Sequence, residues 1–432
     1  MSNNLILMLS VLVVLLLIRM PIGFAMLGAG IAYLAATGQD MGLAAEQVVN
    51  GLYNSYVLLA VPMFIFAANV MNAGTISERL FDFAKVLVGR MRGGLAQVDI
   101  LVSVIFSGMS GSAIADAAGP GLVTIKEMLK KPEYTPGFAG AVVVASATIG
   151  PIIPPSIPMV IYALVSGTSV GALFMGGVIP GLLMAVFMMM GVHWIAVKRN
   201  MPRDTSIKLA DMPRVVLRGL LPLSLPVVLL GGIYSGAFTP TEAAAVAALH
   251  ALVLAGIVYR ALDWKGLFAV TLESARATSV VTLIIASAYL MSYIFTAERL
   301  PATVVDWVNS LGLVQWQFLL LVNVLMLILG CFLDVSVILL VFVPMLIPAA
   351  RMLGVDLVHF GVVVVVNMMI GLVHPPFGML LFVTNALTGI PLKDMIREGW
   401  LFLGILLSAL MLFTFVPQTV LWLPQTMGYK TG

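Results

Sequence analysis

Charged residues are scarce in this sequence. Only 9% of its 432 residues are charged, whereas 61% are hydrophobic. In soluble globular proteins roughly a quarter of the residues are charged, so this composition excludes a water-soluble protein. Each membrane-spanning helix needs about 20 apolar residues, and the apolar runs of this chain provide roughly ten such spans.

The residues from which an enzyme or a metal site would be built are also rare. Cys331 is the only cysteine, which excludes an intramolecular disulfide and a thiol cluster for a metal ion. There is no Walker A loop, so we expect that ATP does not drive this chain. The sequence also lacks a nucleophile elbow and a His/Cys metal motif. We therefore predict no catalytic residues and no enzymatic activity, and no nucleic-acid partner.

The positions of lysine and arginine predict the topology, because these residues collect on the cytoplasmic side of a membrane. The apolar segment 5–18 has no basic stretch before it, so we interpret it as a retained first span. With a periplasmic N-terminus, all of the 22 lysines and arginines except Arg299, Arg351 and Lys430 fall on the cytoplasmic side. This distribution therefore predicts a multi-pass protein with its N-terminus in the periplasm.

That topology requires two segments to enter the membrane and return to the side from which they came. Segment 95–125 has basic clusters at both ends, so it must start and finish in the cytoplasm; segment 316–350 behaves in the same way from the other side. The centre of the first, 107–112, is small, polar and helix-breaking, as the apex of a hairpin requires, and the centre of the second, 330–334, again combines glycine with a polar group. Non-helical backbone at this depth must be surrounded by protein or line a cavity.

The two halves of the chain resemble each other. Gly140 aligns with Gly361, Ile149-Gly150 with Ile370-Gly371, and Pro154-Pro155 with Pro375-Pro376; with one gap, Ser112 aligns with Asp334. An amphipathic helix begins each half, and the charges place the first in the periplasm and the second in the cytoplasm. These features predict inverted repeats, which are typical of secondary transporters. The alternative is chance similarity between apolar helices.

We therefore predict an all-α membrane protein of two inverted repeats, each with a re-entrant helical hairpin and a broken transmembrane helix. The predicted parts are N-terminal scaffold spans in 1–40, the first repeat in 41–200, a linker with two scaffold spans in 201–262, and the second repeat in 263–432. Within the repeats we expect an arm helix and a span at the start of each, hairpins at 95–125 and 316–350, broken spans at 137–165 and 357–388, and closing spans that include 172–197 and 399–423.

Prolines break one span in each repeat. Consecutive prolines stop a helix because they lack an N–H group and disfavour helix in the preceding residue. Each break leaves carbonyl groups that suit a cation such as Na⁺, and helix N-termini that suit an anionic solute. The alternatives are a packing kink at the prolines, and hydroxyl bonds to the helix's own carbonyls at the serines.

The hairpin apices and the breaks together predict two cation sites and a solute site. We expect one cation site at Ser110, Gly111, Ser112 and Gly150, and a second at Gly330, Asp334 and Gly371. Ser146 and Asn367 occupy matching positions one turn before the breaks and are further candidate Na⁺ ligands. The candidate solute-binding residues are Ser110, Ser112, Pro154, Ser156, His374, Pro375 and Asn385.

Two acidic residues also fall within the first predicted hairpin. Asp116 lies about one turn beyond the apex and Asp99 low on the entering leg, and an intramembrane carboxylate is a candidate for a functional role. Asp99 is also close enough in sequence to Arg92 for a simple interfacial ion pair. By contrast, Thr239-Pro240-Thr241-Glu242 has the pattern of a capping box and predicts the start of a helix.

An ordered set of motifs resembles the large membrane subunit of TRAP (tripartite ATP-independent periplasmic) transporters, the DctM-like proteins. The motifs cover essentially the whole chain and are 59–64, the hairpin 106–113, 149–155, 238–243 and 370–378. The resemblance implies an elevator-type, Na⁺-driven importer of organic acids in the bacterial inner membrane, binding two or more Na⁺ ions. It also implies two partners, a small four-span DctQ-like membrane subunit and a periplasmic solute-binding protein.

The chain departs from the family pattern at one position of the second break. His374 stands where the family is expected to have threonine, which puts a hydroxyl ligand there in doubt and indicates a different solute. Two other functions remain open, a stand-alone Na⁺/dicarboxylate symporter or antiporter of the same superfamily and, with less support, a membrane-embedded enzyme.

Overall fold

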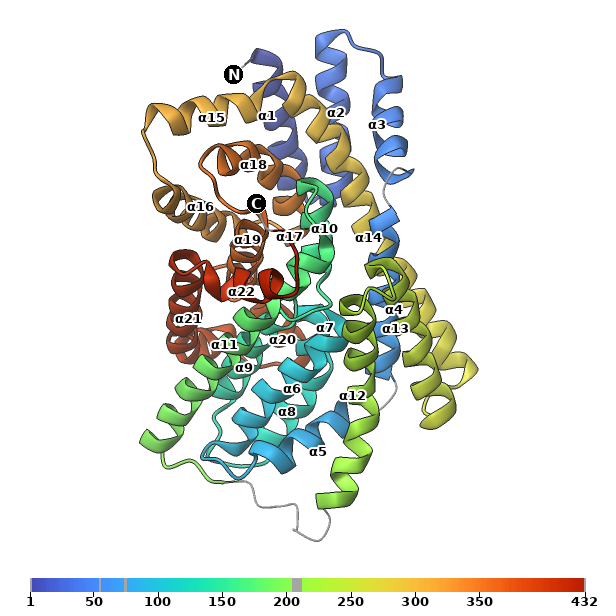
Figure 1. The fold of residues 1–432 in the computed structure, drawn as a ribbon, viewed down its shortest axis with the longest axis vertical. Helices are drawn as coiled ribbons and strands as arrows, with labels where there is room; N and C mark the ends of the chain where they lie inside the picture. The colour runs from blue at the N-terminus through green and yellow to red at the C-terminus, as the bar shows by residue number, and fades with distance from the viewer. Residues whose placement is uncertain (1, 54–55, 74–75, 204–211, 431–432) are drawn as a thin grey trace.

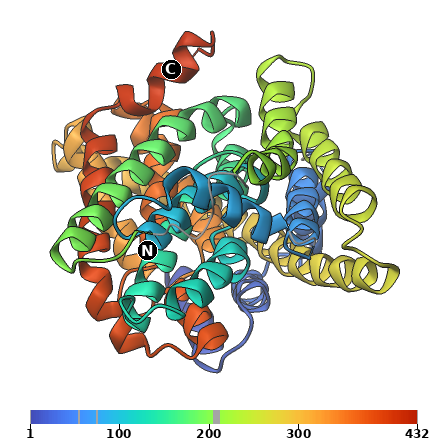
Figure 2. The same ribbon diagram turned by 90° about the horizontal axis from the view of Figure 1, so that it is seen from below.

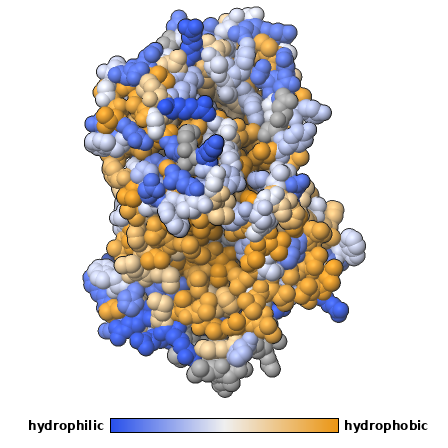
Figure 3. Space-filling view, in the orientation of Figure 1, coloured by the Kyte–Doolittle hydropathy of each residue, from blue (hydrophilic) through white to orange (hydrophobic). Residues whose placement is uncertain are grey.

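The computed structural model describes residues 2–53, 56–73, 76–203 and 212–430, and these residues form helices without a β-strand. Residues 204–211, within the predicted linker 201–262, lie outside this description. Among the described residues, seven helices are long and apolar enough to cross a membrane. The surface of Figure 3 has a matching apolar band across the lower half of the molecule, with hydrophilic surface above it and at its lower edge.

One group of helices, the scaffold group, lies along one side of the molecule (Figures 1 and 2). Helix α14 packs against α2, α3 and α4, α13 packs along α4, and α12 contacts α13. Helix α5 (Ile76–Val88) joins this group to the rest of the chain by contacts with α12 and α6. The scaffold group consists of α1 (Asn3–Leu17), α2 (Ile22–Thr37), α3 (Gly42–Tyr53), the short helix η1 (Tyr56–Leu59), α4 (Ala60–Ala73), α12 (Met212–Tyr234), α13 (Pro240–Leu252), η4 (Val253–Val258) and α14 (Trp264–Ala297).

The other side contains the hairpins and broken spans, and we call it the hairpin group. Its first half consists of α6 (Gly94–Ser110), α7 (Ala113–Ala118), α8 (Pro120–Leu129), α9 (Pro136–Ser146), η2 (Ala147–Ile149), α10 (Ile157–Ser166) and α11 (Val170–Lys198). Its second half consists of α15 (Leu300–Ser310), α16 (Gln315–Gly330), α17 (Val335–Val337), η5 (Ile338–Phe342), α18 (Val343–Met352), α19 (Leu357–Gly371), α20 (Met379–Thr388), α21 (Leu392–Phe415) and α22 (Gln418–Thr426). Apart from α15 and α22, the two halves follow the same order of elements.

The two halves run in opposite directions. Helix α9 begins beside the first turn of α21, where a Cβ atom on Gly137 would lie 2.7 Å from the carbonyl oxygen of Asp394. Helix α19 begins beside the last turn of α21, where Nε2 of His359 lies 2.8 Å from the carbonyl oxygen of Phe413. The broken spans therefore start at opposite ends of α21, which confirms the predicted inversion.

Polar contacts at the two ends of the molecule agree with the topology expected from the charges. Arg199 forms an ion pair with Glu398 at 2.7 Å, and both lie in segments predicted on the cytoplasmic side. At the opposite end, Arg351 donates to the carbonyl oxygen of Ser166 at 3.1 Å, and the carboxylate of Glu298 accepts from Ser2 at 2.6 Å. Each contact joins two segments that the sequence places on the same side.

The structure corrects two expected elements and confirms a helix start. The predicted last span 399–423 is divided at Pro417, so α21 ends at Phe415 and α22 follows. The amphipathic helix expected before the span at 277–295 is continuous with it in the 34-residue α14. At Thr239 the hydroxyl accepts from the backbone N–H of Glu242, and the Glu242 carboxylate accepts from that of Thr239.

Candidate functional site

The first hairpin turns on a glycine and a serine. Helix α6 ends at Ser110, and Gly111 adopts a left-handed conformation with φ of 60°, which glycine takes without steric cost. Ser112 follows as the N-cap of α7, where its hydroxyl accepts a hydrogen bond from the N–H of Ala115 at 3.3 Å. The local sequence thus stops one helix and starts the next within two residues.

The first broken span is interrupted over residues 150–156, all of which are buried. The chain leaves η2 at Gly150, passes a cis peptide bond between Pro154 and Pro155, and re-enters helix at Ser156. The hydroxyl of Ser156 donates to the carbonyl oxygen of Pro151 and accepts from the N–H of Met159. Ser156 therefore fixes the shape of the break.

The first apex lies directly against the first break. A Cβ atom on Gly111 would lie 2.4 Å from the carbonyl oxygen of Pro155, and one on Gly150 would lie 3.6 Å from the carbonyl oxygen of Ser112. The structure therefore brings the predicted residues Ser110, Gly111, Ser112, Gly150, Pro154 and Ser156 together, with backbone carbonyls and hydroxyls as the available ligands.

The second hairpin has the same plan with different residues. Helix α16 ends at Gly330, and Asp334 caps α17 by accepting from the N–H of Ser336 at 2.8 Å. The apex meets the second break at Gly371, where a Cβ atom would lie 2.9 Å from the Cα atom of Gly330. Glycine on both sides lets the two backbones approach this closely. Gly330, Asp334 and Gly371 are thus brought to one place, as the sequence predicts.

The second break also holds the cysteine and a histidine. Sγ of Cys331 lies 3.2 Å from Nδ1 of His374 and 4.0 Å from the carbonyl oxygen of Pro375. Cys331 lines an open groove of about 540 Å³, together with Gly330, Asp334 and Phe377. His374 is half-buried and lies next to this lining through its contact with Cys331.

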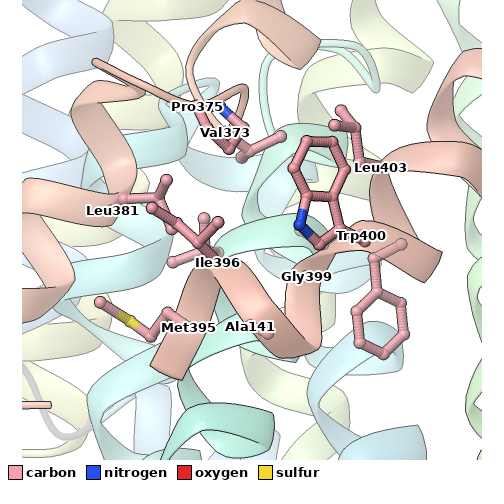
Figure 4. A pocket seen from close by; sticks show the side chains of 12 residues that line it. Ala141, Val373, Pro375, Leu381, Met395, Ile396, Gly399, Trp400 and Leu403 are labelled. Carbon is pink, nitrogen blue, oxygen red and sulfur yellow. The ribbon is translucent and has the colours of Figure 1, made fainter. Parts of the chain in front are cut away.

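The opposite face of the second break is closed by apolar side chains. Figure 4 shows Val373 and Pro375 above Met395, Ile396 and Trp400 of α21. These residues enclose a cavity of only about 20 Å³. Because this face is tightly packed, the groove by Asp334 and Phe377 is the accessible side of the break.

Ser146 and Asn367 lie one turn before the breaks, and each contacts the entering leg of its own hairpin. Ser146 donates to the carboxylate of Asp99 on α6 at 2.6 Å, so Asp99 is bonded to the site rather than to Arg92. Asn367 donates to the side-chain oxygen of Asn323 on α16 at 3.0 Å. Asn323 in turn donates to Thr414 of α21 at 2.8 Å.

The sequence analysis missed Asn323 and Thr414. Their signal was a polar side chain inside an otherwise apolar run, the same signal that marked Asn367. Asn385, in contrast, lies at the far end of α20 and donates to the carbonyl oxygen of Ile390 at 2.8 Å. The structure does not bring it to either apex.

Comparison with known families assigns this architecture. The model of the tripartite ATP-independent periplasmic transporter DctM component matches residues 9–419. The chain belongs to the DctM family. It is thus a large permease component of a TRAP transporter, a multi-pass membrane protein and not an enzyme, as the motifs predicted.

Relatives of this DctM protein serve different solutes. It is 41% identical over 417 residues to the sialic acid TRAP transporter large permease protein SiaM of Vibrio cholerae, covering 96% of this chain and 97% of the relative. It is 42% identical to the C4-dicarboxylate TRAP transporter large permease protein DctM of Pseudomonas aeruginosa, covering 86% and 87%. It is 35% identical to the sialic acid TRAP transporter permease protein SiaT of Haemophilus influenzae, covering 98% of this chain but 68% of SiaT.

A solved structure shares the fold. The YdaH transporter of Alcanivorax borkumensis, described as having an unusual topology, superposes with a TM-score of 0.58 at 15% sequence identity and covers 86% of each chain. At this identity the likeness extends to the arrangement of helices alone.

Proposed function

We propose that this DctM protein imports an organic acid by a Na⁺-driven elevator mechanism, with the solute delivered by a periplasmic binding protein. The observation that carries the proposal is the meeting of two hairpin apices with two broken spans in inverted halves. Such midplane breaks combine helix N-termini for an anionic solute with carbonyls for a cation.

The two apices supply the cation ligands. Around the first, the hydroxyls of Ser110 and Ser112 and the backbone at Gly111 and Gly150 offer only oxygen donors near the turn. Around the second, Asp334 adds a carboxylate next to the backbone of Gly330 and Gly371. An all-oxygen ligand set suits a hard cation such as Na⁺, so we assign one Na⁺ to each apex.

The solute site lies between the apices, with His374 beside the groove-lining Cys331 at the second break and Ser156 at the first. Pro375, also a candidate, lies on the closed face of the second break. The start of α10 follows the first break and the start of α20 follows the second. The positive ends of these two helix dipoles favour a carboxylate. The groove by Asp334 is large enough for a small organic acid.

Movement of the hairpin group against the scaffold group would expose this site on each side in turn. Where hairpin residues 333–345 face α1, α2 and α14, the cavity between them has a volume of about 280 Å³ and an entirely apolar lining. The described residues that line this cavity are all apolar, so the two surfaces can slide past one another there, which favours rigid-body motion.

Two partners complete the proposed transporter, a small DctQ-like membrane subunit and a periplasmic solute-binding protein. This chain covers 68% of SiaT of Haemophilus influenzae. The isethionate TRAP permease of Oleidesulfovibrio alaskensis is named DctMQ, and this chain covers 63% of it. The name DctMQ and the additional length of both relatives support a DctQ-like partner for the DctM part. The charge distribution supports an inner-membrane location with a periplasmic N-terminus.

Reconstitution tests the proposal. Proteoliposomes with the chain, its small subunit and binding protein should take up solute only with a Na⁺ gradient. Ser112→Ala and Asp334→Ala should each raise the Na⁺ concentration for half-maximal uptake by about tenfold, because each removes a ligand oxygen worth on the order of 1–3 kcal/mol. Unchanged Na⁺ dependence in both would remove these residues as ligands, and uptake by the chain alone would favour a stand-alone symporter.

A further inference from the structure

A buried carboxylate on the returning leg of the first hairpin has no partner. Asp116 of α7 is 1% exposed, and neither of its side-chain oxygens has a hydrogen-bond partner among the described residues. A second buried carboxylate, that of Asp99 on α6, is also 1% exposed and lies near enough to repel it. The hairpin thus holds two buried acids in electrostatic contact.

The surroundings supply oxygen atoms. The electrostatic neighbours of Asp116 in the described part of the chain are Asp99 and the hydroxyl of Ser103, while Asp99 has the hydroxyls of Ser146 and Thr124 beside it. Ser146 donates to Asp99 at 2.6 Å. Thus Asp99 is stabilised by hydroxyl donors, whereas Asp116 is left with both oxygens free.

Two neighbouring carboxylates in a buried site need a compensating charge, because burial and mutual repulsion both disfavour the ionised forms. A buried acceptor without a partner calls for an explanation, and a bound cation is one. The oxygen atoms of Asp116, Asp99 and Ser103 all come from two neighbouring helices of one hairpin, so a bound ion would move with the hairpin as a unit.

We propose that Asp116 and Asp99, with the hydroxyl of Ser103, bind a further Na⁺ ion, separate from those at the two apices. Oxygen-only ligands exclude a soft metal. A divalent ion prefers six or more ordered oxygens, more than these side chains offer. One monovalent ion leaves a single negative charge, which the hydroxyl donors to Asp99 stabilise.

The site adjoins the first apex without overlapping it. Ser146 connects the two, because its hydroxyl is bonded to Asp99 while its backbone lies one turn before Gly150. Na⁺ at Asp116 would therefore hold α6, α7 and α9 in the arrangement that the apex needs. The inference rests on the proposed Na⁺ coupling and adds one ion to it.

Counting bound ions tests this inference. Radioactive Na⁺ binding to the purified full chain, in choline buffer at fixed pH, should show one ion fewer in Asp116→Asn than in the wild-type protein. The matched control Asp82→Asn, at an acid on α5 outside the hairpin, should leave the number unchanged. Ser103→Ala, which keeps both carboxylates, should weaken binding of this ion by several-fold.

The outcomes separate the two proposals. If Ser112→Ala and Asp334→Ala lose Na⁺ and Asp116→Asn binds as many ions as the wild type, the further site is wrong and the apex sites stand. If the wild-type protein binds no Na⁺ at all, the proposed function itself fails. Retention of the full count by Asp99→Asn, or displacement of the ion by micromolar Ca²⁺, would also overturn the inference. A misfolded Asp116→Asn leaves the Ser103→Ala and Asp99→Asn measurements to decide.

Discussion

The two apex–break pairs share a plan but differ in how open they are. Around the first, residues 150–156 are all buried, and the apex contributes only hydroxyls and backbone. Around the second, Phe332 and Phe377 are 66% and 54% exposed with ring centroids 5.5 Å apart, beside the groove that reaches Asp334. The first pair is thus enclosed and the second is open to a groove, so in the proposed mechanism the solute would reach the second pair more easily.

The difference shows what an inverted repeat keeps and what it changes. Three backbone features recur in both halves. They are a glycine where the apex approaches the break most closely, a helix N-cap after the turn, and paired prolines in the break. Side chains in and beside the groove diverge, since the thiol of Cys331 and the imidazole of His374 have no counterpart at the first break. Under the proposed function, the shared backbone geometry would serve the mechanism common to both halves, and the divergent side chains the individual solute.

The largest expected effect comes from adding one methyl group at the first apex. Gly111→Ala would place a Cβ atom 2.4 Å from the Pro155 carbonyl oxygen at a φ of 60°, so the apex must move. A shift of about 1 Å in a site of this kind costs on the order of 100-fold in rate. Gly371→Ala should cost about tenfold less, because the second apex can relax into the groove. Initial rates of uptake in proteoliposomes measure both.

A matched control separates the clash from backbone strain. Gly167 has a similar φ of 71°, but nothing lies within 4 Å of a Cβ atom placed there. Gly167→Ala should therefore reduce uptake by only about twofold, as expected for local strain alone. Equal losses in Gly111→Ala and Gly167→Ala would show that the contact with Pro155 has no special role.

The next effect concerns the groove side of the second break. His374→Thr restores the hydroxyl expected from the family and should change the solute concentration for half-maximal uptake by about tenfold, as loss of a charge-assisted hydrogen bond does. The Na⁺ dependence should change by less than about twofold, since the cation ligands stay in place. Cys331→Ser, which keeps a donor beside His374, serves as the control. A change in Na⁺ dependence alone would contradict the division between the two breaks.

A smaller effect, on stability, concerns the hydrogen-bonded side chains Asn367, Asn323 and Thr414 near the second break. Asn323→Ala removes two buried side-chain hydrogen bonds, one with Asn367 and one with Thr414, so unfolding should become easier by about 2 kcal/mol, or about 1 kcal/mol for each bond. Asn385→Ala, which removes one bond to the end of α20, should cost about 1 kcal/mol. Thermal unfolding in detergent measures both. A change in solute affinity in Asn385→Ala would instead support the original prediction that Asn385 contacts solute.

The smallest effect depends on pH and lies far from both breaks. Hydrogen bonds from Ser2 and Tyr33 lower the pKa of Glu298 below its usual value. A lowered pKa contributes stability above the unfolded pKa of about 4.3, and this contribution is lost as pH falls through the lower folded value. Glu298→Gln should therefore flatten the decline in melting temperature below about pH 5, by two degrees or less near the surface. An unchanged decline would show that another acid is responsible.

The positions of the hairpins and breaks could be predicted from the sequence alone, because each is marked by residues that stop or start a helix locally. Ser112, Asp334 and the paired prolines stop or start helices through their own chemistry, so each was found without knowing its neighbours. The alignment of Ser112 with Asp334 also matched their equivalent places as caps in the structure.

What the sequence could not provide were contacts between distant segments. The bond from Ser146 to Asp99 and the chain from Asn367 through Asn323 to Thr414 depend on how the legs pack. Asn385 is a polar residue in an apolar segment, like the other candidates. Only the fold showed that its side chain bonds the carbonyl oxygen of Ile390 just beyond the end of α20. The division of the last span at Pro417 was missed because the apolar run continues across it.

The contact between Gly330 and Gly371 has a practical consequence for protein engineering. Since the closest approach of the second apex to its break is made by backbone alone, no side chain needs to be preserved there to keep the two in register. The neighbouring positions 331, 374 and 377 can then be randomised together in a library that is screened for new solutes. Selection for growth on a chosen organic acid would test many solute-contacting side chains while the hairpins and broken spans keep their backbone geometry.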